Sequence, residues 1–397
     1  MNSARPAGAA PVLLYLVTED WYFLSHRIPM AKAALEAGYR VHVATHVTGD
    51  GGRRIEALGF TVHPLAWRRG SLNPLDLVSI LRQVRALYRR LSPDLVHHVA
   101  LQPSVIGSLA AIGLPIARIN AFAGLGSSVT SQSAKARLVR PVLKGLLRWI
   151  LRGRHAAALV QNGDDRAVML ASGVDPDRVF LIPGSGVDVD VLTPLPEPAA
   201  RPDGMVTVAF VGRLLEDKGL RTLVAAHDLL TARGLPVRLK IAGQADPANP
   251  ASIPDAEIAA WADKPNIELL GHVTDIASVW RQANIAVLPS RREGLPKSLL
   301  EAAACGRAMV ASDVPGCREV ARQNVNALLV PPDDAPALAE AIAALAGDPA
   351  MRRRFAEAGR EMAVTEFSSE RIGQQTVALY DTLVRRPDAP ALAGASD

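Results

Sequence analysis

Short apolar runs alternate with amphipathic stretches along the whole chain. The apolar runs are PVLLYLVT, YRVHVAT, DLVHHVA, PIARIN and AAALVQN, and then MVTVAFVG, VRLKIAG, NIELLG, NIAVLPS, AMVASD and NALLV. Helical periodicity marks stretches between them, among them 26–38, 75–91 and 219–234. Continuous apolar strands that alternate with helices are typical of parallel sheets covered on both faces. The pattern therefore predicts two doubly wound, Rossmann-like α/β domains in tandem.

A proline-rich stretch marks the expected domain boundary. The sequence LTPLPEPAARPDG, residues 192–204, holds four prolines and lacks apolar periodicity, which is typical of a linker. The expected division is a first domain over 1–190, a linker over 191–204, a second domain over 205–366, a helix over 367–386 that crosses back to the first domain, and a disordered tail over 387–397.

Composition narrows the class of protein. A chain of 397 residues that is 49% hydrophobic and 21% charged is globular and suits two domains. Its two cysteines, Cys305 and Cys317, are too few for a disulfide scaffold and are expected to be buried thiols in a reducing compartment. The first apolar run stops at Glu19, far short of the roughly twenty residues that span a membrane. We therefore expect a cytoplasmic protein.

Charge is distributed unevenly. Residues 1–188 carry 22 Lys and Arg against 12 Asp and Glu, whereas residues 189–397 carry 22 against 27. A basic first half indicates an anionic partner, such as nucleic acid, phosphate or an acidic membrane surface. The segment 133–154 spaces seven cations among apolar residues, a pattern that suits an anionic bilayer and also an ordinary surface helix with its apolar face in the core. No recognition motif for nucleic acid accompanies the charge.

Charged residues follow two strands of the second half. Arg213 comes directly after the strand MVTVAFVG, and Lys218 precedes a helix. Ligands of open parallel sheets bind at the carboxyl ends of strands, where two cations beside a helix N-terminus would bind a diphosphate. A solvated loop is the alternative.

Two glutamates stand in the stretch SRREGLPKSLLEAAACG. Glu293 lies on the loop after the strand NIAVLPS, and Glu301 lies in the helix that Pro296 opens and Gly306 ends. Helical side chains lean toward the N-terminus, so Glu301 should point back toward the same site as Glu293. Two carboxylates that accept hydrogen bonds from hydroxyls suit a ribose and a hexose, and the backbone amides of Gly294 and Leu295 would add donors.

These motifs carry a family resemblance. FVGRLLEDKGL, followed by PSRREGLPKSLLEAAACG and DVPGCREV, resembles the nucleotide-sugar domain of retaining family 4 glycosyltransferases of the GT-B fold, in which two Rossmann-like domains face each other across a cleft. The first-half stretch from Leu16 to Thr45, the GSGVD at 184–188 and the terminal helix resemble the same family. Within it, the chain is most similar to enzymes that extend undecaprenyl-diphosphate-linked sugars in capsule, O-antigen or glycan assembly.

The resemblance implies a role for each matching residue. Arg213 and Lys218 would hold the donor diphosphate and stabilise it as a leaving group, while Glu301 would bind the ribose hydroxyls. Glu293 would face the transferred sugar, with Gly294 and Leu295 beside it, and Val273 would meet the base. The resemblance implies no cofactor and no metal, with a nucleotide sugar as co-substrate.

The acceptor side is less defined. The resemblance places Asp20 and His26, after the first strand, near the acceptor and its diphosphate. Many family members have a histidine after the strand PIARIN, but this chain reads NAFAGLGSS there, so Asn120, Gly124 and Gly126 are expected to shape that wall. His97 and His98 end a strand, and each could line the cleft or be a structural histidine.

Two further functions and one metal pattern stay open beside this hypothesis. The expected reaction moves a hexosyl or N-acetylhexosaminyl group from a UDP-sugar, with retention, to a polyprenyl-diphosphate-linked saccharide at the inner face of the membrane. The alternatives are a UDP-sugar 2-epimerase of the same fold and a non-catalytic sugar-nucleotide or lipid-binding partner. Asp188 and Asp190 match a metal-binding pattern of another glycosyltransferase fold, but they precede a linker, which disfavours a metal role. The sequence contains neither a Walker A nor a GxGxxG motif.

Overall fold

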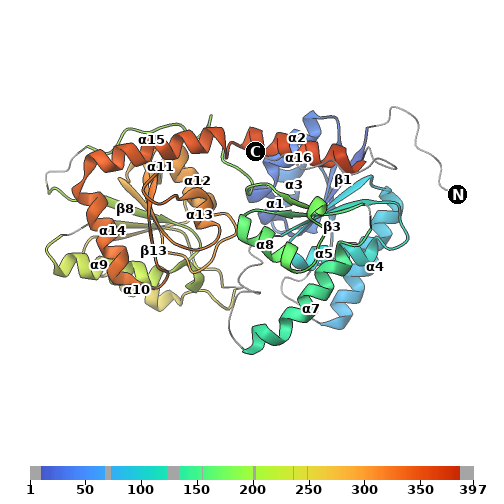
Figure 1. Cartoon of the computed structure of the whole chain (residues 1–397), viewed down its shortest axis with the longest axis horizontal. Helices are drawn as coiled ribbons and strands as arrows, with labels where there is room; N and C mark the ends of the chain where they lie inside the picture. The colour runs from blue at the N-terminus through green and yellow to red at the C-terminus, as the bar shows by residue number, and fades with distance from the viewer. Residues whose placement is uncertain are drawn as a thin grey trace. The chain divides into compact units, whose positions relative to one another are not determined.

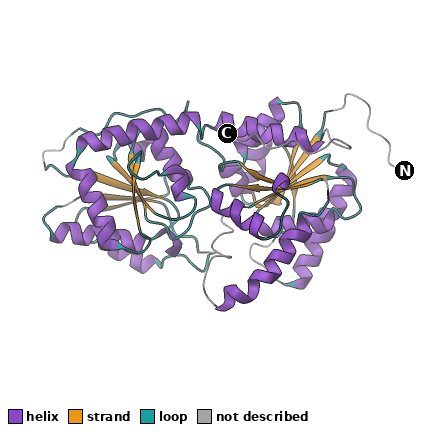
Figure 2. Ribbon diagram, in the orientation of Figure 1, coloured by secondary structure: helices purple, strands orange, loops and turns teal. Residues whose placement is uncertain are grey.

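The chain forms two compact units, each a parallel sheet with helices on both faces (Figures 1 and 2). The structure, a computed structural model, describes residues 10–67, 73–122, 134–153, 155–199, 203–235, 237–247 and 249–384, with only the backbone of 134–140. The first unit comprises the residues up to Ser185 and those from Glu370 on, and the second is Gly186–Ser369. The predicted fold class, two Rossmann-like α/β domains, is confirmed.

The first unit has a seven-stranded sheet in the order β3-β2-β1-β4-β5-β6-β7. Its strands are β1 (Val12–Glu19), β2 (Arg40–His46), β3 (Thr61–Pro64), β4 (Leu95–Val99), β5 (Ala117–Ala121), β6 (Ala156–Val160) and β7 (Val179–Leu181). Its helices are α1 (Asp20–His26), α2 (Ile28–Glu36), α3 (Gly51–Glu56), α4 (Pro74–Leu91), α5 (Leu101–Ala110), α7 (Ala134–Ile150), α8 (Gly163–Ala171) and α16 (Ser369–Val384).

The second unit has a six-stranded sheet in the order β10-β9-β8-β11-β12-β13. Its strands are β8 (Thr207–Val211), β9 (Arg238–Ala242), β10 (Ile267–Gly271), β11 (Ile285–Leu288), β12 (Ala308–Ser312) and β13 (Ala327–Val330). Its helices are α9 (Leu220–Ala232), α10 (Asp255–Ala262), α11 (Ile276–Arg281), α12 (Lys297–Ala304), α13 (Cys317–Val320), α14 (Ala335–Gly347) and α15 (Pro349–Thr365).

Alternation along β1 shows why the first sheet is covered twice. Leu13, Tyr15 and Val17 belong to one buried cluster, and the intervening Leu14 and Leu16 belong to another. Successive side chains of a strand point to opposite faces, so each face of an apolar strand needs its own cover. The first cluster is completed by α2 and α16, and the second by α4 and α5.

Helix α16 packs on the first unit through a polar contact as well as apolar ones. The Tyr380 hydroxyl lies 2.7 Å from the Tyr15 hydroxyl and 2.7 Å from Nδ1 of His97, and all three side chains are fully buried. At the rim, the Tyr39 hydroxyl donates to Asp381 at 2.7 Å. Buried polar groups that satisfy one another favour a single register of α16 on the sheet.

The segment expected to be a linker packs on the second unit instead. The division falls between Ser185 and Gly186, not at 190/191. Arg307 donates to the carbonyls of Leu195 and Pro196, and Arg360 donates to the carbonyls of Val189 and Leu192. Prolines cannot donate a backbone hydrogen bond, but their carbonyls still accept one. Arginine side chains therefore fix the first part of this proline-rich stretch, as far as Pro196. The tail 387–397 lies outside the described residues.

Two strands of the first unit were missing from the sequence prediction. Both β3 and β7 lie at an edge of the sheet and have only four and three residues. Edge strands are commonly short and half-exposed, so they lack the continuous apolar run that marks a central strand. Each of the eleven predicted strands is present, five in the first sheet and six in the second.

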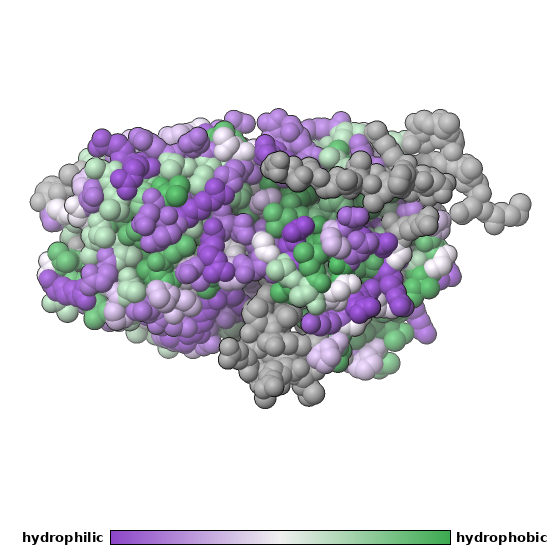
Figure 3. All heavy atoms as spheres, viewed as in Figure 1, coloured by the Kyte–Doolittle hydropathy of each residue, from purple (hydrophilic) through white to green (hydrophobic). Residues whose placement is uncertain are grey.

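Helix α7 holds part of the basic segment 133–154. Leu143, Leu147 and Ile150 are buried in a cluster with β6 and α8, while Val142 is 70% exposed. In its described second half, the apolar face of α7 therefore lies in the core. None of the described helices is long and apolar enough to cross a membrane. On the face seen in Figure 3, hydrophilic and hydrophobic residues are interspersed.

Candidate functional site

The candidate site lies where the strand order of the second sheet reverses. β8 pairs with both β9 and β11, and the chain leaves β8 toward one edge of the sheet and β11 toward the other. Loops that diverge from neighbouring strands leave a crevice between them, which is where open α/β sheets bind ligands. The loop after β8 carries Arg213 and Lys218, and the loop after β11 carries Glu293.

Backbone contacts hold these two loops together. The Asp217 carbonyl accepts a hydrogen bond from the Arg291 amide at 2.8 Å, and the Asp217 carboxylate pairs with Arg292. Gly219, which precedes α9, has φ +71°, and a Cβ there would lie 1.9 Å from the Pro289 carbonyl oxygen. No other residue fits so close to the β11 loop in that conformation. The cations of the first loop are therefore fixed relative to the carboxylate of the second.

Lys218 and Glu293 meet directly. Lys218 Nζ lies 2.5 Å from Glu293 Oε1, and the Ser290 hydroxyl donates to the same oxygen at 2.7 Å. The Glu293 side chain is 9% exposed and that of Lys218 22%. A charge pair this sheltered from water is screened far less than a surface pair. The structure therefore brings together two positions that the sequence analysis assigned to one site, and Ser290 is a polar contact that sequence reasoning missed.

Arg213 has a carboxylate partner of its own. Its Nη1 lies 2.9 Å from Oδ2 of Asp246, and the Arg213 side chain is 45% exposed. Asp246 lies on the loop after β9, and its backbone amide donates to the Ser252 hydroxyl at 2.9 Å. The sequence offered no signal for Asp246, because the contact joins loops 33 residues apart.

Glu301 lies in the second turn of α12, as predicted. Its side chain is 12% exposed, and Lys297 Nζ approaches it at 3.5 Å from one turn earlier. Burial raises the pKa of Glu301, and the charge of Lys297 partly opposes that rise. Gly306 ends the helix with φ +67°, the left-handed conformation expected after a helix C-terminus.

The loop after β12 packs closely against the loop that carries Glu293. Gly316 has φ +79°, and a Cβ there would lie 2.5 Å from the Gly294 carbonyl oxygen and 2.7 Å from that of Glu293. The next residue, Cys317, is fully buried, and burial together with the Glu293 charge raises the pKa of its thiol. The sequence DVPGCREV thus supports the backbone that presents Glu293. Leu295 and Val273, which follows β10, are both partly buried against the core.

The first unit treats its predicted polar residues differently. Asp20 is 1% exposed, and its carboxylate accepts from the Thr48 amide at 2.6 Å, the Thr48 hydroxyl at 2.8 Å and the Trp21 amide at 2.7 Å. The carboxylate therefore fixes the start of α1 to the loop after β2 rather than facing a ligand. His26 stacks on Tyr22 with ring centroids 4.4 Å apart, and its Nδ1 lies 2.6 Å from the Ser25 hydroxyl.

His98 and Asn120 are both fully buried. Of the two alternatives left open for His98, it is therefore the structural histidine, and Asn120 does not shape a wall of the cleft as expected. His98 Nδ1 lies 2.8 Å from Asn120 Oδ1, and His98 Nε2 lies 2.9 Å from the Tyr88 hydroxyl. Both ring nitrogens of His98 therefore have hydrogen-bond partners, one on β5 and one on α4. Burial lowers the pKa of His98 to about 4, so this ring is neutral at pH 7. Gly124 and Gly126 lie outside the described residues.

Asp188 and Asp190 form a turn. Asp188 Oδ1 accepts hydrogen bonds from the backbone amides of Asp190 and Val191 at 3.2 and 3.0 Å. These bonds, from a side chain to the backbone two and three residues later, are typical of an Asx-turn. In the described ranges, no three His, Cys, Asp or Glu side chains are grouped as metal ligands would be.

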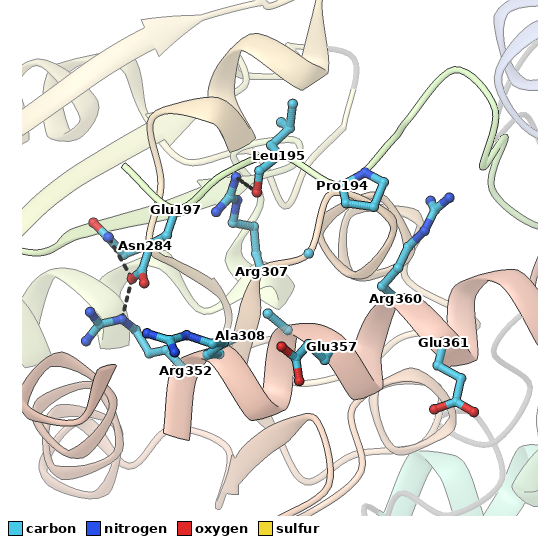
Figure 4. A pocket seen from close by; sticks show the side chains of 13 residues that line it. Pro194, Leu195, Glu197, Asn284, Arg307, Ala308, Arg352, Glu357, Arg360 and Glu361 are labelled. Atoms are coloured by element: carbon cyan, nitrogen blue, oxygen red, sulfur yellow. Dashed lines mark hydrogen bonds and ion pairs between the residues drawn. The ribbon is translucent and has the colours of Figure 1, made fainter. Parts of the chain in front are cut away.

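A separate cavity of about 510 Å³ opens at the other end of the second sheet (Figure 4). It lies beside Asn284 and Arg307, which precede β11 and β12, and beneath α15. Arg352 pairs with Glu197 at 2.5 Å, and Arg307 donates to the Leu195 carbonyl, as Figure 4 shows. These arginines hold the segment before β8. The cavity therefore lies where this segment packs on the second unit, away from the candidate site.

Comparison with known proteins accounts for both units. The family described as "Glycosyl transferase 4-like" matches residues 12–160, and "Glycosyl transferases group 1" matches residues 206–348. The chain belongs to the group 1, family 4-like glycosyltransferases. The first match covers β1 to β6, and the second covers all six strands of the second sheet. The second match includes Arg213, Lys218, Glu293 and Glu301.

Relatives cover nearly the full length of this glycosyltransferase. The N,N'-diacetylbacillosaminyl-diphospho-undecaprenol alpha-1,3-N-acetylgalactosaminyltransferase of Campylobacter jejuni is 26% identical, over 91% of this chain and 98% of that protein. The capsular polysaccharide biosynthesis glycosyltransferase CapM of Staphylococcus aureus is 22% identical, over 95% and 98%. Among solved structures, HepE from Anabaena in complex with UDP-glucose superposes with a TM-score of 0.74 at 17% identity, over 94% of this chain and 99% of that one.

Proposed function

We propose that this glycosyltransferase moves a hexosyl or N-acetylhexosaminyl group from a UDP-sugar, with retention of configuration, to a polyprenyl-diphosphate-linked saccharide in cell-surface polysaccharide or glycan assembly. The observation that carries the proposal is the Lys218–Glu293 pair at the reversal point of the second sheet, sheltered from water and anchored by Ser290. The relative from Campylobacter jejuni acts on an undecaprenol-diphosphate-linked sugar, and HepE binds UDP-glucose, which supports the acceptor and donor classes.

The pairing suggests how the donor is received. Without donor, Lys218 is neutralised by Glu293 and Arg213 by Asp246. A nucleoside diphosphate would offer stronger acceptors to both cations, so Lys218 would turn to the phosphate and Glu293 would be released to accept hydrogen bonds from the sugar hydroxyls. As the glycosidic bond to the phosphate breaks, negative charge grows on the leaving diphosphate. Arg213 and Lys218 stabilise that charge, which lowers the barrier.

The donor and acceptor classes can be tested with one panel of substrates. Purified protein is incubated with UDP-linked and other nucleotide sugars together with prenyl-diphosphate-linked saccharides, and products are identified by mass and by the anomeric configuration in NMR spectra. The proposal expects UDP release coupled to a longer, retained-configuration glycan. A change of configuration at the sugar's second carbon without transfer would indicate the epimerase alternative, and nucleotide binding without any product would indicate a non-catalytic partner.

We also propose that no metal is needed for this transfer, because the two cations supply the charge stabilisation. EDTA is expected to leave the wild-type rate largely unchanged. Complete loss of activity that added Mg²⁺ or Mn²⁺ restores would contradict this part of the proposal.

Membrane association through the basic segment 133–154 follows from the proposed acceptor, whose lipid stays in the bilayer. Because the apolar face of α7 is buried from Leu143 on, contact would be electrostatic rather than by insertion. Each cation near an anionic surface contributes about 1 kcal/mol, and salt screens the attraction. We expect co-sedimentation with vesicles containing anionic lipid that falls at high salt and in a Lys135, Arg137, Arg140 and Lys144 to Gln variant. Equal binding to neutral vesicles, or no loss in the variant, would contradict it.

A further inference from the structure

Three side chains with rings, Trp21, Tyr22 and His26, lie on α1 at the carboxyl end of β1, and we call them the aromatic ridge. Helix α1 begins directly after this strand, which pairs with both β2 and β4, so α1 sits at the reversal point of the first sheet. The rings of Trp21 and Tyr22 meet edge to face at 5.8 Å, and Tyr22 stacks on His26 at 4.4 Å with an angle of 6°. The ridge, Trp21 with Tyr22 and His26, thus occupies the same place in the first unit as the charged loops occupy in the second.

Trp21 is exposed although its chain position is fixed. All five tryptophans lie in the described part of the chain, and Trp21, at 38%, is the one that is exposed. The Asp20 carboxylate accepts from the Trp21 amide, and the Ser25 hydroxyl donates to the Trp21 carbonyl at 2.8 Å. A Cβ on Gly51 would lie 2.0 Å from Asp20 Oδ2, so α3 packs directly against this anchor. The indole is therefore held outward by a rigid frame.

The ridge suits a sugar ring. One face of a pyranose presents C–H groups, and an indole face offers a flat apolar surface with negative charge density that attracts them. The Tyr22 hydroxyl, on a partly buried ring, can both donate and accept and could bond a sugar hydroxyl beside the stack. A rigid aromatic anchor also loses little conformational entropy on binding.

We propose that Trp21, together with Tyr22, forms a stacking subsite for a pyranose ring of the acceptor saccharide. The proposal rests on the proposed function for the existence of a saccharide acceptor, and it adds a specific aromatic contact for one sugar ring of that acceptor. Asp20 and Ser25 are positioning residues of the subsite, because they act through the backbone of Trp21.

Kinetics of Trp21 variants test the subsite. The probe is the prenyl-diphosphate saccharide that the wild type uses best, on a short, water-soluble prenyl chain. Trp21→Ala should raise the KM for this acceptor about tenfold, the loss of one aromatic contact, with the KM for the donor and the slow hydrolysis of donor without acceptor unchanged. Trp21→Phe should restore most of the affinity. Leu35→Ala on α2 is the matched control, because Leu35 is also 38% exposed in the first unit.

Three outcomes would overturn the subsite while leaving the proposed function intact. The first is transfer by Trp21→Ala with unchanged KM for the acceptor, and the second is an equal loss with Leu35→Ala. The third is a loss seen only with a long-chain acceptor in vesicles and not with the soluble one, which would make Trp21 a membrane contact. Absence of transfer by the wild type with every acceptor would instead contradict the proposed function. Thermal unfolding of each variant shows whether it is folded.

Discussion

The carboxyl edges of the two sheets share a topology but differ in chemistry. In the second unit, charged side chains on neighbouring loops meet in a sheltered site, with Lys218 and Glu293 at its centre. In the first unit, the acid at the corresponding place is Asp20, whose carboxylate accepts hydrogen bonds from the Thr48 amide and hydroxyl. The aromatic rings of Trp21 and Tyr22 lie beside it. A nucleoside diphosphate demands charge, whereas a saccharide can be bound by flat apolar surfaces and single hydrogen bonds. The difference suggests that the units divide the two substrates between them.

The largest expected effect concerns the cations of the second unit. Arg213→Ala and Lys218→Ala should each lower kcat roughly a hundredfold or more, because each removes a cation that we propose stabilises charge in the transition state. Lys218→Ala also leaves Glu293 as a buried carboxylate without its cation, so its folding is checked by thermal unfolding. Arg233→Ala is the matched control, since Arg233 is 42% exposed in the same unit and pairs with Glu340. Equal losses in the control would contradict the assignment.

The two glutamates should give a smaller effect and different signatures. Glu301→Gln is expected to raise the KM for the donor about tenfold with little change in kcat, because a ribose contact is the same in ground and transition states. Glu293→Gln should lower kcat more than it raises KM, since we propose that Glu293 faces the transferred sugar. Steady-state kinetics with varied donor distinguish the two, and identical signatures would show that the roles are not divided.

Acid should distinguish the units at the level of stability. In the first unit, burial lowers the pKa of His42 and His98 to about 4 and places those of His63 and His97 below 6.5; in the described part of the second unit, His227 alone is lowered. Unfolded histidines take up protons near pH 6.5 while the folded ones stay neutral, so stability is lost as pH falls from 6.5 toward 4. For the fully buried His98 alone, the loss between pH 7 and pH 5 is about 2 kcal/mol.

Hydrogen exchange at pH 7 and pH 5 measures that difference. Amides of the first unit should lose protection at pH 5 more than those of the second unit. His98→Gln should be less stable than the wild type at pH 7 but should lose less on acidification. Equal loss of protection in both units, or a pH dependence unchanged by His98→Gln, would contradict the account.

The sequence predicted all six strands of the second unit but only five of the seven strands of the first. Arg213, Lys218, Glu293 and Glu301 stand on loops or helices directly after strands, so strand periodicity alone places them at one edge. Ser290 and Asp246 escaped notice because their roles depend on side-chain geometry between segments distant in the chain. A Ser or Asp in a loop has no periodic signature.

In the first unit, polar residues in strands were harder to place: the sequence left two roles open for His98, and Asn120 is buried where a wall of the cleft was expected. His98 and Asn120 belong to apolar strands, where a polar side chain can face a ligand or a buried partner, and the choice depends on the helix opposite. Here Tyr88 of α4 and Asn120 itself satisfy His98. The sequence carries no signal that Trp21 is exposed, because an aromatic residue after an apolar strand can lie in the core or at the surface. Its exposure follows from the Asp20–Thr48 anchor, which joins segments 28 residues apart.

The central claim is that the nucleoside diphosphate binds at the reversal point of the second sheet. Isothermal titration of UDP into the wild type, Lys218→Ala, Arg233→Ala and Trp21→Ala tests it most directly. The account predicts saturable binding by the wild type, unchanged affinity in Arg233→Ala and Trp21→Ala, and at least tenfold weaker binding in Lys218→Ala, because a charge-assisted contact to phosphate is lost. UDP binding that survives Lys218→Ala undiminished, or that falls as much in Trp21→Ala, would contradict it.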